Sequence, residues 1–273
     1  MDLRRSSPLS TPAPWNLVAA DYAEELVPVF SNFAADALRL AQLAPGARVL
    51  DVAAGPGTLA CLAARAGART TAIDFSRAMA DRLAARTAAE GLTIDVRVGD
   101  GQALPFGEGA FEAAFSMFGL IFFPDRARGF RELLRVLVPS GVAVVSSWVP
   151  VSRVPIMEAM FTAIAELQQP GQAKGPSKGP LATPDDCREE MGAAGFTAVQ
   201  VKEVTYGSRH SSMAALWDFS VRTAAPLALL RESLGGSAWA ELSAGVMERL
   251  VARFGEGPQD MALPANLLCG RRP

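Results

Sequence analysis

The chain has 273 residues, half of them apolar, with 26 Lys and Arg side chains against 28 Asp and Glu and a formal net charge of −2. This length and apolar content allow a core without disulfides or metals, while the interspersed charges argue against a nucleic-acid groove or a polybasic membrane patch. No run approaches the roughly 18 apolar residues of a membrane-spanning helix, and the polar, proline-bearing start is unlike a secretion signal, so we expect a cytoplasmic protein.

The N-terminal region divides into two parts. Residues 1–14 are rich in Ser and Pro and are predicted to be disordered. Residues 15–43 carry apolar side chains at spacings of three to five and are predicted to be helical. Pro45 and Gly46 end that helical region and lead into the first strand.

Residues 49–148 alternate between apolar strands and helices. The predicted strands are 49–52, 70–75, 93–98, 111–118 and 142–148, and the predicted helices are 58–67, 77–90 and 125–137. Ser76 is a favourable N-cap, and Gly91 a favourable stop, for the second of these helices. Such an alternation predicts an α/β fold with a parallel, doubly wound sheet and right-handed crossovers.

The second half of the chain is less regular. The pattern predicts helices at 155–167 and 185–194, two or three helices within 213–254, and strands at 197–206 and 261–269. A strand, a helical excursion and a returning strand suggest a hairpin at the sheet edge with a helical insert. Residues 168–180 form a polar loop that is longer than most connections in compact domains, which makes it a candidate lid.

The most informative segment is VLDVAAGPGTLA, residues 49–60. Asp51 interrupts an apolar strand, where a carboxylate without a partner is costly to bury. Gly55 and Gly57 permit a tight turn and a close approach of the backbone to a ligand. A strand, an acid, a glycine turn and a helix in this order are typical of a nucleotide-type site at the carboxyl end of a parallel sheet, and the acid suggests a positively charged ligand.

Two further acids end the next two predicted strands. Asp74 stands 23 positions after Asp51, where an acid accepts the hydrogen bonds of a ribose diol. Asp100 is followed by Gly101 and Gln102, whose backbone amides suit an adenine edge. Helix capping or an ordinary turn is the alternative explanation for each acid alone, but the three together predict an adenosine site on one sheet edge.

Two cofactors fit such a site. A dinucleotide needs a glycine fingerprint at a helix N-terminus facing its pyrophosphate, and Gly55-x-Gly57-x-x-Ala60 matches that pattern only loosely. S-adenosylmethionine carries a sulfonium and an ammonium instead, and Asp51 suits those positive charges. An NAD-dependent oxidoreductase and a non-catalytic cofactor-binding protein therefore stay open as alternatives to a methyltransferase.

Residues 49–148 resemble the core of the class I S-adenosylmethionine-dependent methyltransferases, and most of all the ubiquinone and menaquinone biosynthesis branch. The matching segments are LDVAAGPG, AIDFS, VGDGQALPF, FEAAFSMFGLIFFPD and LLRVLVPSGVAVVSSW. The chain departs from the family pattern at Ala53, where glycine is frequent, and in its VPSG turn. The resemblance implies a Rossmann-like, seven-stranded, mostly parallel sheet with an antiparallel last strand, N-terminal helices and a helical lid or insert.

The resemblance also implies roles for individual residues in holding the cofactor. Asp51 would lie near its methionine end, Asp74 would hold the ribose, and Asp100 would take the adenine amino group. The full cofactor-binding set that we predict is Asp51, Ala53, Gly55, Gly57, Asp74, Phe75, Ser76, Met79, Asp100, Gly101, Gln102, Ser116 and Met117. In this scheme residues 15–150 form the cofactor-binding core with its helical cover, and residues 151–273 complete the same domain with substrate-binding helical insertions.

The acceptor is predicted to be a small molecule with apolar character. Its candidate contacts are the aromatic side chains Trp15, Tyr22, Phe118, Phe122 and Trp148, for which ordinary core packing is the alternative. Methyl transfer from a sulfonium is an in-line displacement that needs a base only for a weakly acidic acceptor. O-methylation of a phenol or enol is favoured, and N- or C-methylation stays open.

His210 is the only histidine, and so the only candidate of its kind for a general base; a solvated loop side chain is the alternative. Cys61, Cys187 and Cys269 have no paired spacing, which favours reduced thiols over disulfides or a zinc site, and no metal is expected. We expect a monomer or homodimer that acts on a small molecule and binds no nucleic acid.

Overall fold

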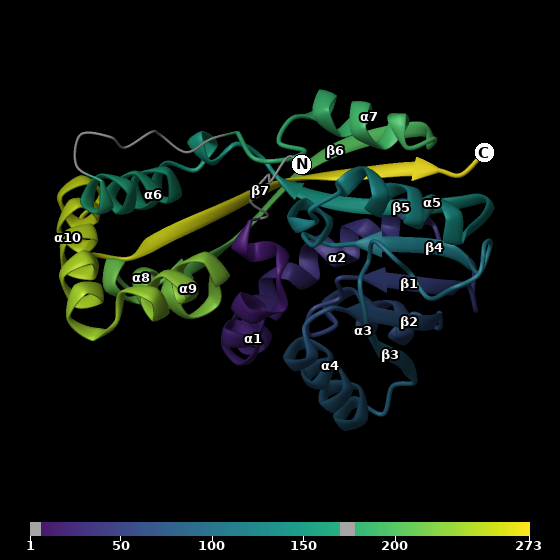
Figure 1. Cartoon of the computed structure of the whole chain (residues 1–273), viewed down its shortest axis with the longest axis horizontal. Helices are drawn as coiled ribbons and strands as arrows, with labels where there is room; N and C mark the ends of the chain where they lie inside the picture. The colour runs from purple at the N-terminus through teal and green to yellow at the C-terminus, as the bar shows by residue number, and fades with distance from the viewer. Residues whose placement is uncertain (1–6, 170–177) are drawn as a thin grey trace, which may run out of the picture.

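The computed structural model describes residues 7–169 and 178–273 and is built on one seven-stranded sheet (Figure 1). The strand order is β3-β2-β1-β4-β5-β7-β6. The strands are β1 (Arg48–Val52), β2 (Arg69–Asp74), β3 (Ile94–Val98), β4 (Phe111–Ser116), β5 (Leu137–Trp148), β6 (Thr197–His210) and β7 (Gln259–Arg271).

The strand directions confirm the predicted sheet. Strands β1 to β5 pair in parallel with their neighbours, and β7 is antiparallel to both β5 and β6. One strand, the last, therefore runs against the other six. The central strands are nearly continuous apolar runs because helices cover both of their faces.

Helices flank the sheet in two layers that follow from the alternation of side chains along each strand. Phe115 on β4 packs against α2 and α3, whereas Ala114 beside it packs against α5 and α7. The α-helices are α1 (Pro12–Asp21), α2 (Val27–Ala41), α3 (Thr58–Arg65), α4 (Arg77–Glu90), α5 (Arg126–Val136), α6 (Pro155–Gln168), α7 (Pro184–Ala193), α8 (Met213–Thr223), α9 (Ala225–Leu234) and α10 (Gly236–Phe254). Shorter helical turns are η1 (Pro8–Ser10), η2 (Tyr22–Leu26), η3 (Leu120–Phe122) and η4 (Val151–Arg153).

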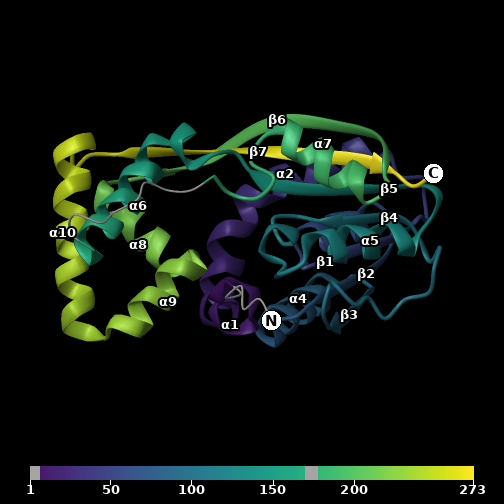
Figure 2. The same ribbon diagram turned by 45° about the horizontal axis from the view of Figure 1, so that its top comes forward.

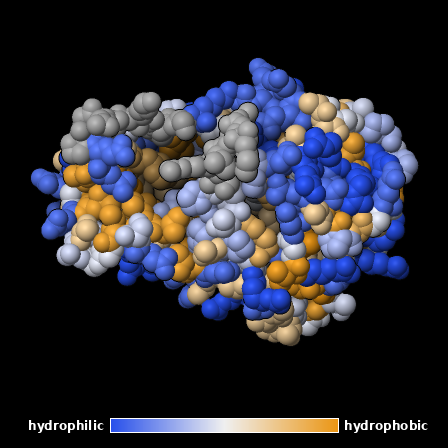
Figure 3. Space-filling view, in the orientation of Figure 1, coloured by the Kyte–Doolittle hydropathy of each residue, from blue (hydrophilic) through white to orange (hydrophobic). Residues whose placement is uncertain are grey.

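The C-terminal helices form an insert at one end of the molecule. Strands β6 and β7 extend past the parallel strands, and α6, α8, α9 and α10 gather around their far end (Figures 1 and 2). Helix α1 lies between this insert and α4. In Figure 3, apolar residues gather on the surface over the insert, at left, while the face over α5 and α7, at right, is mostly hydrophilic.

Most predicted elements are present, with differences at their ends. Helix α4 has the predicted bounds because Ser76 caps its start and Gly91 adopts φ +64° at its end. Strand β6 continues four residues past the predicted end, to His210. The predicted hairpin with a helical insert is also found.

The N-terminus differs more. Residues 7–14 were expected to be disordered, yet Ser7 caps η1 and α1 begins at Pro12, because proline is well suited to the first turn of a helix. Residues 1–6, and residues 170–177 of the candidate lid, lie outside the described residues. Within the described residues, every helix is too short or too polar to cross a membrane.

Candidate functional site

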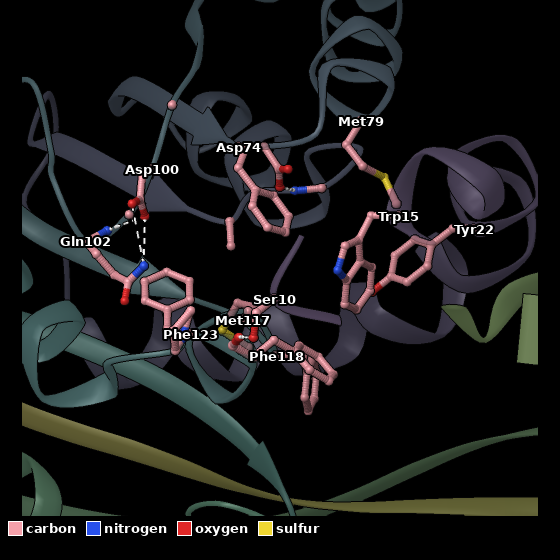
Figure 4. Close-up of a pocket in the computed structure, with 18 residues that line it drawn as sticks. Ser10, Trp15, Tyr22, Asp74, Met79, Asp100, Gln102, Met117, Phe118 and Phe123 are labelled. Carbon is pink, nitrogen blue, oxygen red and sulfur yellow. Dashed lines mark hydrogen bonds between the residues drawn. The ribbon is translucent and has the colours of Figure 1, made fainter. Parts of the chain in front are cut away.

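A cavity of about 220 Å³ opens at the carboxyl ends of β1 to β4, beneath α1 (Figure 4). Its walls come from the loops after these strands and from the N-terminal residues that cover them. The lining residues are Ser10, Trp15, Tyr22, Ala53, Gly55, Asp74, Phe75, Met79, Gly99, Asp100, Gly101, Gln102, Met117, Phe118, Gly119, Phe122, Phe123 and Pro124.

The turn after β1 forms the floor of the cavity. Ala53, Gly55 and Gly57 all adopt positive φ, at 57°, 55° and 81°. A Cβ at Gly57 would lie 2.0 Å from Cδ1 of the buried Leu83, and with the left-handed φ this position favours glycine. A Cβ at Gly119 would lie 2.3 Å from that of Ala53, which shows how the chain makes room for alanine at this left-handed position.

Asp51 is buried at the end of β1 with half of its hydrogen-bonding capacity unused. Its Oδ2 accepts from the Ala60 amide at 3.0 Å, and its Oδ1 has no hydrogen-bond partner among the residues that the structure describes. Burial raises the pKa of Asp51 to about 8, and the nearby charge of Asp74 adds to this. Asp51 lines a second hollow of about 30 Å³, and the residues common to both hollows are Tyr22, Ala53, Gly55, Met117 and Phe118.

Asp74 ends β2 and reaches the main cavity. Its Oδ2 accepts from the Gly55 amide, and its Oδ1 from the Ser76 amide, both at 2.8 Å. Burial raises the pKa of Asp74 to about 6, against the lowering effect of these two bonds. The carboxylate thus joins the glycine turn after β1 to the start of α4.

Asp100 is exposed at the far side of the cavity, after β3. Its Oδ1 accepts from the Gln102 amide at 2.8 Å (Figure 4). The Gln102 side chain accepts in turn from the Asp125 amide at 2.9 Å. A Cβ at Gly101 would lie 2.4 Å from the Phe123 ring, so glycine allows that ring to wall the cavity.

The turn after β4 is held by two buried serines. Ser116 Oγ accepts from the Leu120 amide at 3.1 Å, and Ser146 Oγ accepts from the Phe118 amide at 2.8 Å. Phe118 adopts φ +58°, a conformation that a bulky residue rarely takes. Its ring stacks on Trp148 at 3.9 Å between centroids, so Trp148 supports the cavity wall from behind.

The N-terminal residues close the cavity from above, and sequence reasoning missed several of them. Ser10 Oγ donates to the Phe122 carbonyl at 2.8 Å, and the Trp15 ring packs edge-on against Phe122 at 4.9 Å. Asn16 Oδ1 accepts from Ser76 Oγ at 2.6 Å. Pro12 was the sequence signal that a helix begins here, because proline is favoured in the first turn of a helix. The Ser- and Pro-rich composition of the segment obscured that signal.

The structure brings most predicted site residues to these hollows. Those lining one or both are Trp15, Tyr22, Asp51, Ala53, Gly55, Asp74, Phe75, Met79, Asp100, Gly101, Gln102, Met117, Phe118 and Phe122. Gly57, Ser76, Ser116 and Trp148 do not line them but shape the turns and walls around them.

His210 is not brought to either hollow. Its Nε2 shares a 2.7 Å hydrogen bond with Ser208, and its ring packs against Phe219 of the insert at 4.7 Å. Burial lowers its pKa, against the charge of Glu25. Extension of β6 beyond Tyr206 carries the histidine into the insert, which explains the difference from the expected position.

The charge of the site is one-sided. Among the residues that line the two hollows in the described part of the chain, Asp51, Asp74 and Asp100 are the charged ones, and none is Lys, Arg or His. Within the described residues, no three His, Cys, Asp or Glu side chains lie close enough together to hold a metal ion. The site therefore suits a neutral or positively charged ligand.

Known proteins resemble this chain in sequence. The family model described as a methyltransferase domain matches residues 49–141. An uncharacterized protein of Mycobacterium tuberculosis is 38% identical over 136 residues, which cover 50% of this chain and 49% of the relative. A demethylmenaquinone methyltransferase of Corynebacterium efficiens is 30% identical over 186 residues, covering 63% of this chain and 77% of the relative. The chain spans about half the length of the curated relatives it matches first.

Solved structures share the fold at lower identity. A putative methyltransferase from Bacillus halodurans has a TM-score of 0.59 at 17% identity, over 89% of this chain and 99% of the other. The cyclase SpnF has a TM-score of 0.57 at 22% identity, over 89% and 80%. With the sequence relatives, these findings show that the chain belongs to the S-adenosylmethionine-dependent methyltransferase family, in which it resembles the demethylmenaquinone methyltransferases.

Proposed function

We propose that this protein transfers a methyl group from S-adenosylmethionine to a small, neutral, partly apolar acceptor, with a phenol or enol oxygen as the favoured atom. One observation carries the proposal: three carboxylates from consecutive strand ends line two hollows that share part of their walls, and no basic side chain lines either hollow within the described residues. Such a site favours a ligand that carries positive charge and a ribose, because bare carboxylates repel anions.

The residues present fit the cofactor. The unpartnered Oδ1 of buried Asp51 calls for a positive charge beside it, and the sulfonium end of S-adenosylmethionine supplies one. We infer that Asp74 accepts from the ribose hydroxyls and that Asp100 and the Gly101 amide hold the adenine, while the Gln102 amide donates to Asp100. Ala53, Gly55, Phe75, Met79 and Met117 complete the proposed walls of the cofactor site. When bound, the cofactor provides a methyl group that is already activated for displacement.

A dinucleotide fits the same residues poorly. Its pyrophosphate would bring negative charge to the turn after β1, next to Asp51 and Asp74. Dinucleotide sites place a helix N-terminus and a ribose-binding acid there, but they do not need the second, buried acid of β1. The unused Oδ1 of Asp51 therefore favours methyl transfer over hydride transfer.

The acceptor class follows from the aromatic side of the cavity. Trp15, Tyr22, Phe118 and Phe122 offer apolar walls, and the absence of basic side chains among the described lining residues disfavours phosphate or carboxylate groups on the acceptor. The protein then contributes by holding the acceptor in line and excluding water, which supplies roughly 7–11 kcal/mol of a barrier in favourable cases. With His210 outside the cavity, an acceptor that ionises easily is favoured.

The test is thermal unfolding with S-adenosylhomocysteine and, separately, with NAD. A ligand at 100 times its dissociation constant stabilises the native state by about 2.7 kcal/mol. We expect S-adenosylhomocysteine to raise the Tm of the wild-type protein but not of Asp51→Ala, with the exposed Asp81→Ala as the matched control that keeps the shift.

Three results would contradict parts of the proposal. A shift with NAD alone would overturn the cofactor assignment. Retained micromolar binding of S-adenosylhomocysteine by Asp51→Ala would overturn the position of the sulfonium end. Binding without transfer of labelled methyl groups to any of a panel of phenols, enols and amines would support a non-catalytic cofactor-binding protein instead.

A further inference from the structure

A cluster of charges joins the C-terminal insert to residues 12–26, the N-terminal segment that covers the cavity and is called the cover below. Nη1 of Arg222, on α8, lies 3.1 Å from Asp21 Oδ1 and 2.7 Å from Glu25 Oε1. Its Nε lies 2.8 Å from Oδ2 of Asp218, one turn earlier on the same helix. One guanidinium thus holds three carboxylates, two of which belong to the chain segment that covers the cavity.

The two acids of the cover flank Tyr22, which lines both hollows. Asp21 ends α1, and Glu25 lies in the wide π-helical turn η2, which begins at Tyr22. Two like charges four residues apart repel each other on a helix, and wide turns of this kind are rare and frequently mark functional sites. Arg222 cancels the repulsion by binding both acids at once.

Tyr22 has an unusual environment for a phenol. It lines both hollows, next to Trp15 and Met79 (Figure 4), and its hydroxyl has no hydrogen-bond partner among the described residues. Burial, followed by the charge of Asp74, raises its pKa. The phenol therefore stays protonated and presents a hydrogen-bond donor between the two hollows.

Helix α8 is a rigid support for Arg222. Leu216 is fully buried, Phe219 lies in the same apolar cluster, and Trp217 Nε1 donates to Ser243 of α10 at 2.7 Å. Helix α1 itself packs through the buried Val18 and Ala19 against Met79 of α4 and Ala225 of α9. Arg222 adds a charged link from α8 to the acids on either side of Tyr22, at the turn where α1 ends.

We propose that Arg222 is a positioning residue that fixes Tyr22 at the junction of the two hollows, so that helix α8 of the insert forms part of the functional site. Its consequence for methyl transfer rests on the proposed function, but its effect on Tyr22 does not. Arg222 touches neither hollow; it acts through Asp21 and Glu25.

The test is amide hydrogen exchange of residues 12–26 in the ligand-free Arg222→Gln protein. We expect exchange in this segment to rise at least tenfold while exchange in α5 stays unchanged, and the dissociation constant of S-adenosylhomocysteine to rise three- to tenfold. Arg153→Gln is the matched control, because it removes an exposed pair with Glu203 that is remote from the cover; both values should stay at wild-type level.

A rescue variant separates positioning from general loss of stability. In Arg222→Gln/Asp21→Asn/Glu25→Gln the repulsion is gone, so slow exchange at residues 12–26 should return. Unchanged exchange in Arg222→Gln, a rise spread equally over α5, or failure of the triple variant to recover would each overturn the proposal. Absence of S-adenosylhomocysteine binding in the wild-type protein would contradict the proposed function alone, since the exchange measurement needs no ligand.

Discussion

The buried carboxylate of Asp51 lowers the stability of the ligand-free protein when it is ionised, although the same negative charge would favour binding of a cationic ligand. Burial raises its pKa from 3.8 to about 8, so in the ligand-free protein the folded state holds a proton that the unfolded chain releases above about pH 4. A raised pKa means that the stabilising contribution is complete below pH 3.8 and is lost as the pH rises through 8. A cation beside Oδ1 would stabilise the ionised carboxylate and so offset this loss of folding stability.

We predict that Asp51→Asn removes much of this pH dependence. Above pH 8 the neutral amide avoids the buried charge, so the free energy of unfolding of the ligand-free variant should exceed that of the wild type by about 1 kcal/mol or more. This excess should shrink as the pH falls and vanish only below pH 3.8, where the wild-type carboxyl is protonated in both the folded and the unfolded chain. Urea unfolding at pH 5, 7 and 9 measures this, with Asp81→Asn as control; a parallel pH profile for Asp51→Asn would contradict the argument.

At the scale of single residues, the sequence predicted where side chains lie when a residue type has one dominant physical cause. Acids at the ends of apolar strands and glycines in the turn after them are conspicuous, and Asp51, Asp74 and Gly55 do lie together at the hollows. The positive φ of Phe118 has no such signature, because the Ser146 hydroxyl that satisfies its amide comes from another strand. Non-local partners of this kind are invisible to a pattern search.

At the scale of elements, caps determined which helix bounds could be predicted. Helix α4 was predicted to the residue because Ser76 and Gly91 are strong local signals. Helix α1 lacks a side-chain cap at Thr11, and its apolar residues pack against α4 and α9 rather than along one stripe. Its start was therefore missed, and with it the contacts of Ser10 and Asn16.

Asn16 is the point at which α1 docks on α4, and we predict that Asn16→Ala loosens the cover. Its Oδ1 accepts from Ser76 Oγ, and removal of such a bond costs about 1 kcal/mol, or roughly fivefold in an equilibrium. Calorimetric titration with S-adenosylhomocysteine should show affinity reduced by about that factor. Asn32→Ala, which removes an exposed bond within α2, should bind normally; an equal loss in both variants would refute a docking role for Asn16.

At the scale of the whole molecule, the hairpin of β6 and β7 joins two apolar clusters. Leu267 on β7 belongs to the cluster of the insert, and its neighbour Leu268 belongs to the cluster beneath α5 and α7. Alternation along the chain predicted both strands, and a strand, a helical excursion and a returning strand predicted their hairpin at the sheet edge with its helical insert. The hairpin makes the insert continuous with the sheet. Its pairing with β5 and the two clusters that it joins depend on contacts far apart in sequence, which the residue pattern alone does not specify.

This continuity predicts that the insert and the sheet unfold together. Gly207 of β6 lies opposite Ala262, and a Cβ there would lie 2.4 Å from the Met261 carbonyl oxygen, so Gly207→Ala should cost roughly 1–3 kcal/mol through strand separation.

If β6 and β7 form one cooperative unit, the substitution should lower a single unfolding midpoint seen equally by far-UV circular dichroism and by tryptophan fluorescence, to which Trp217 and Trp239 of the insert contribute. Gly236→Ala, where a Cβ meets no atom within 4 Å, is the control. Separate midpoints for the two signals would mean that the helical insert is an independent domain and that its support of the cavity is not built into the folding of the sheet.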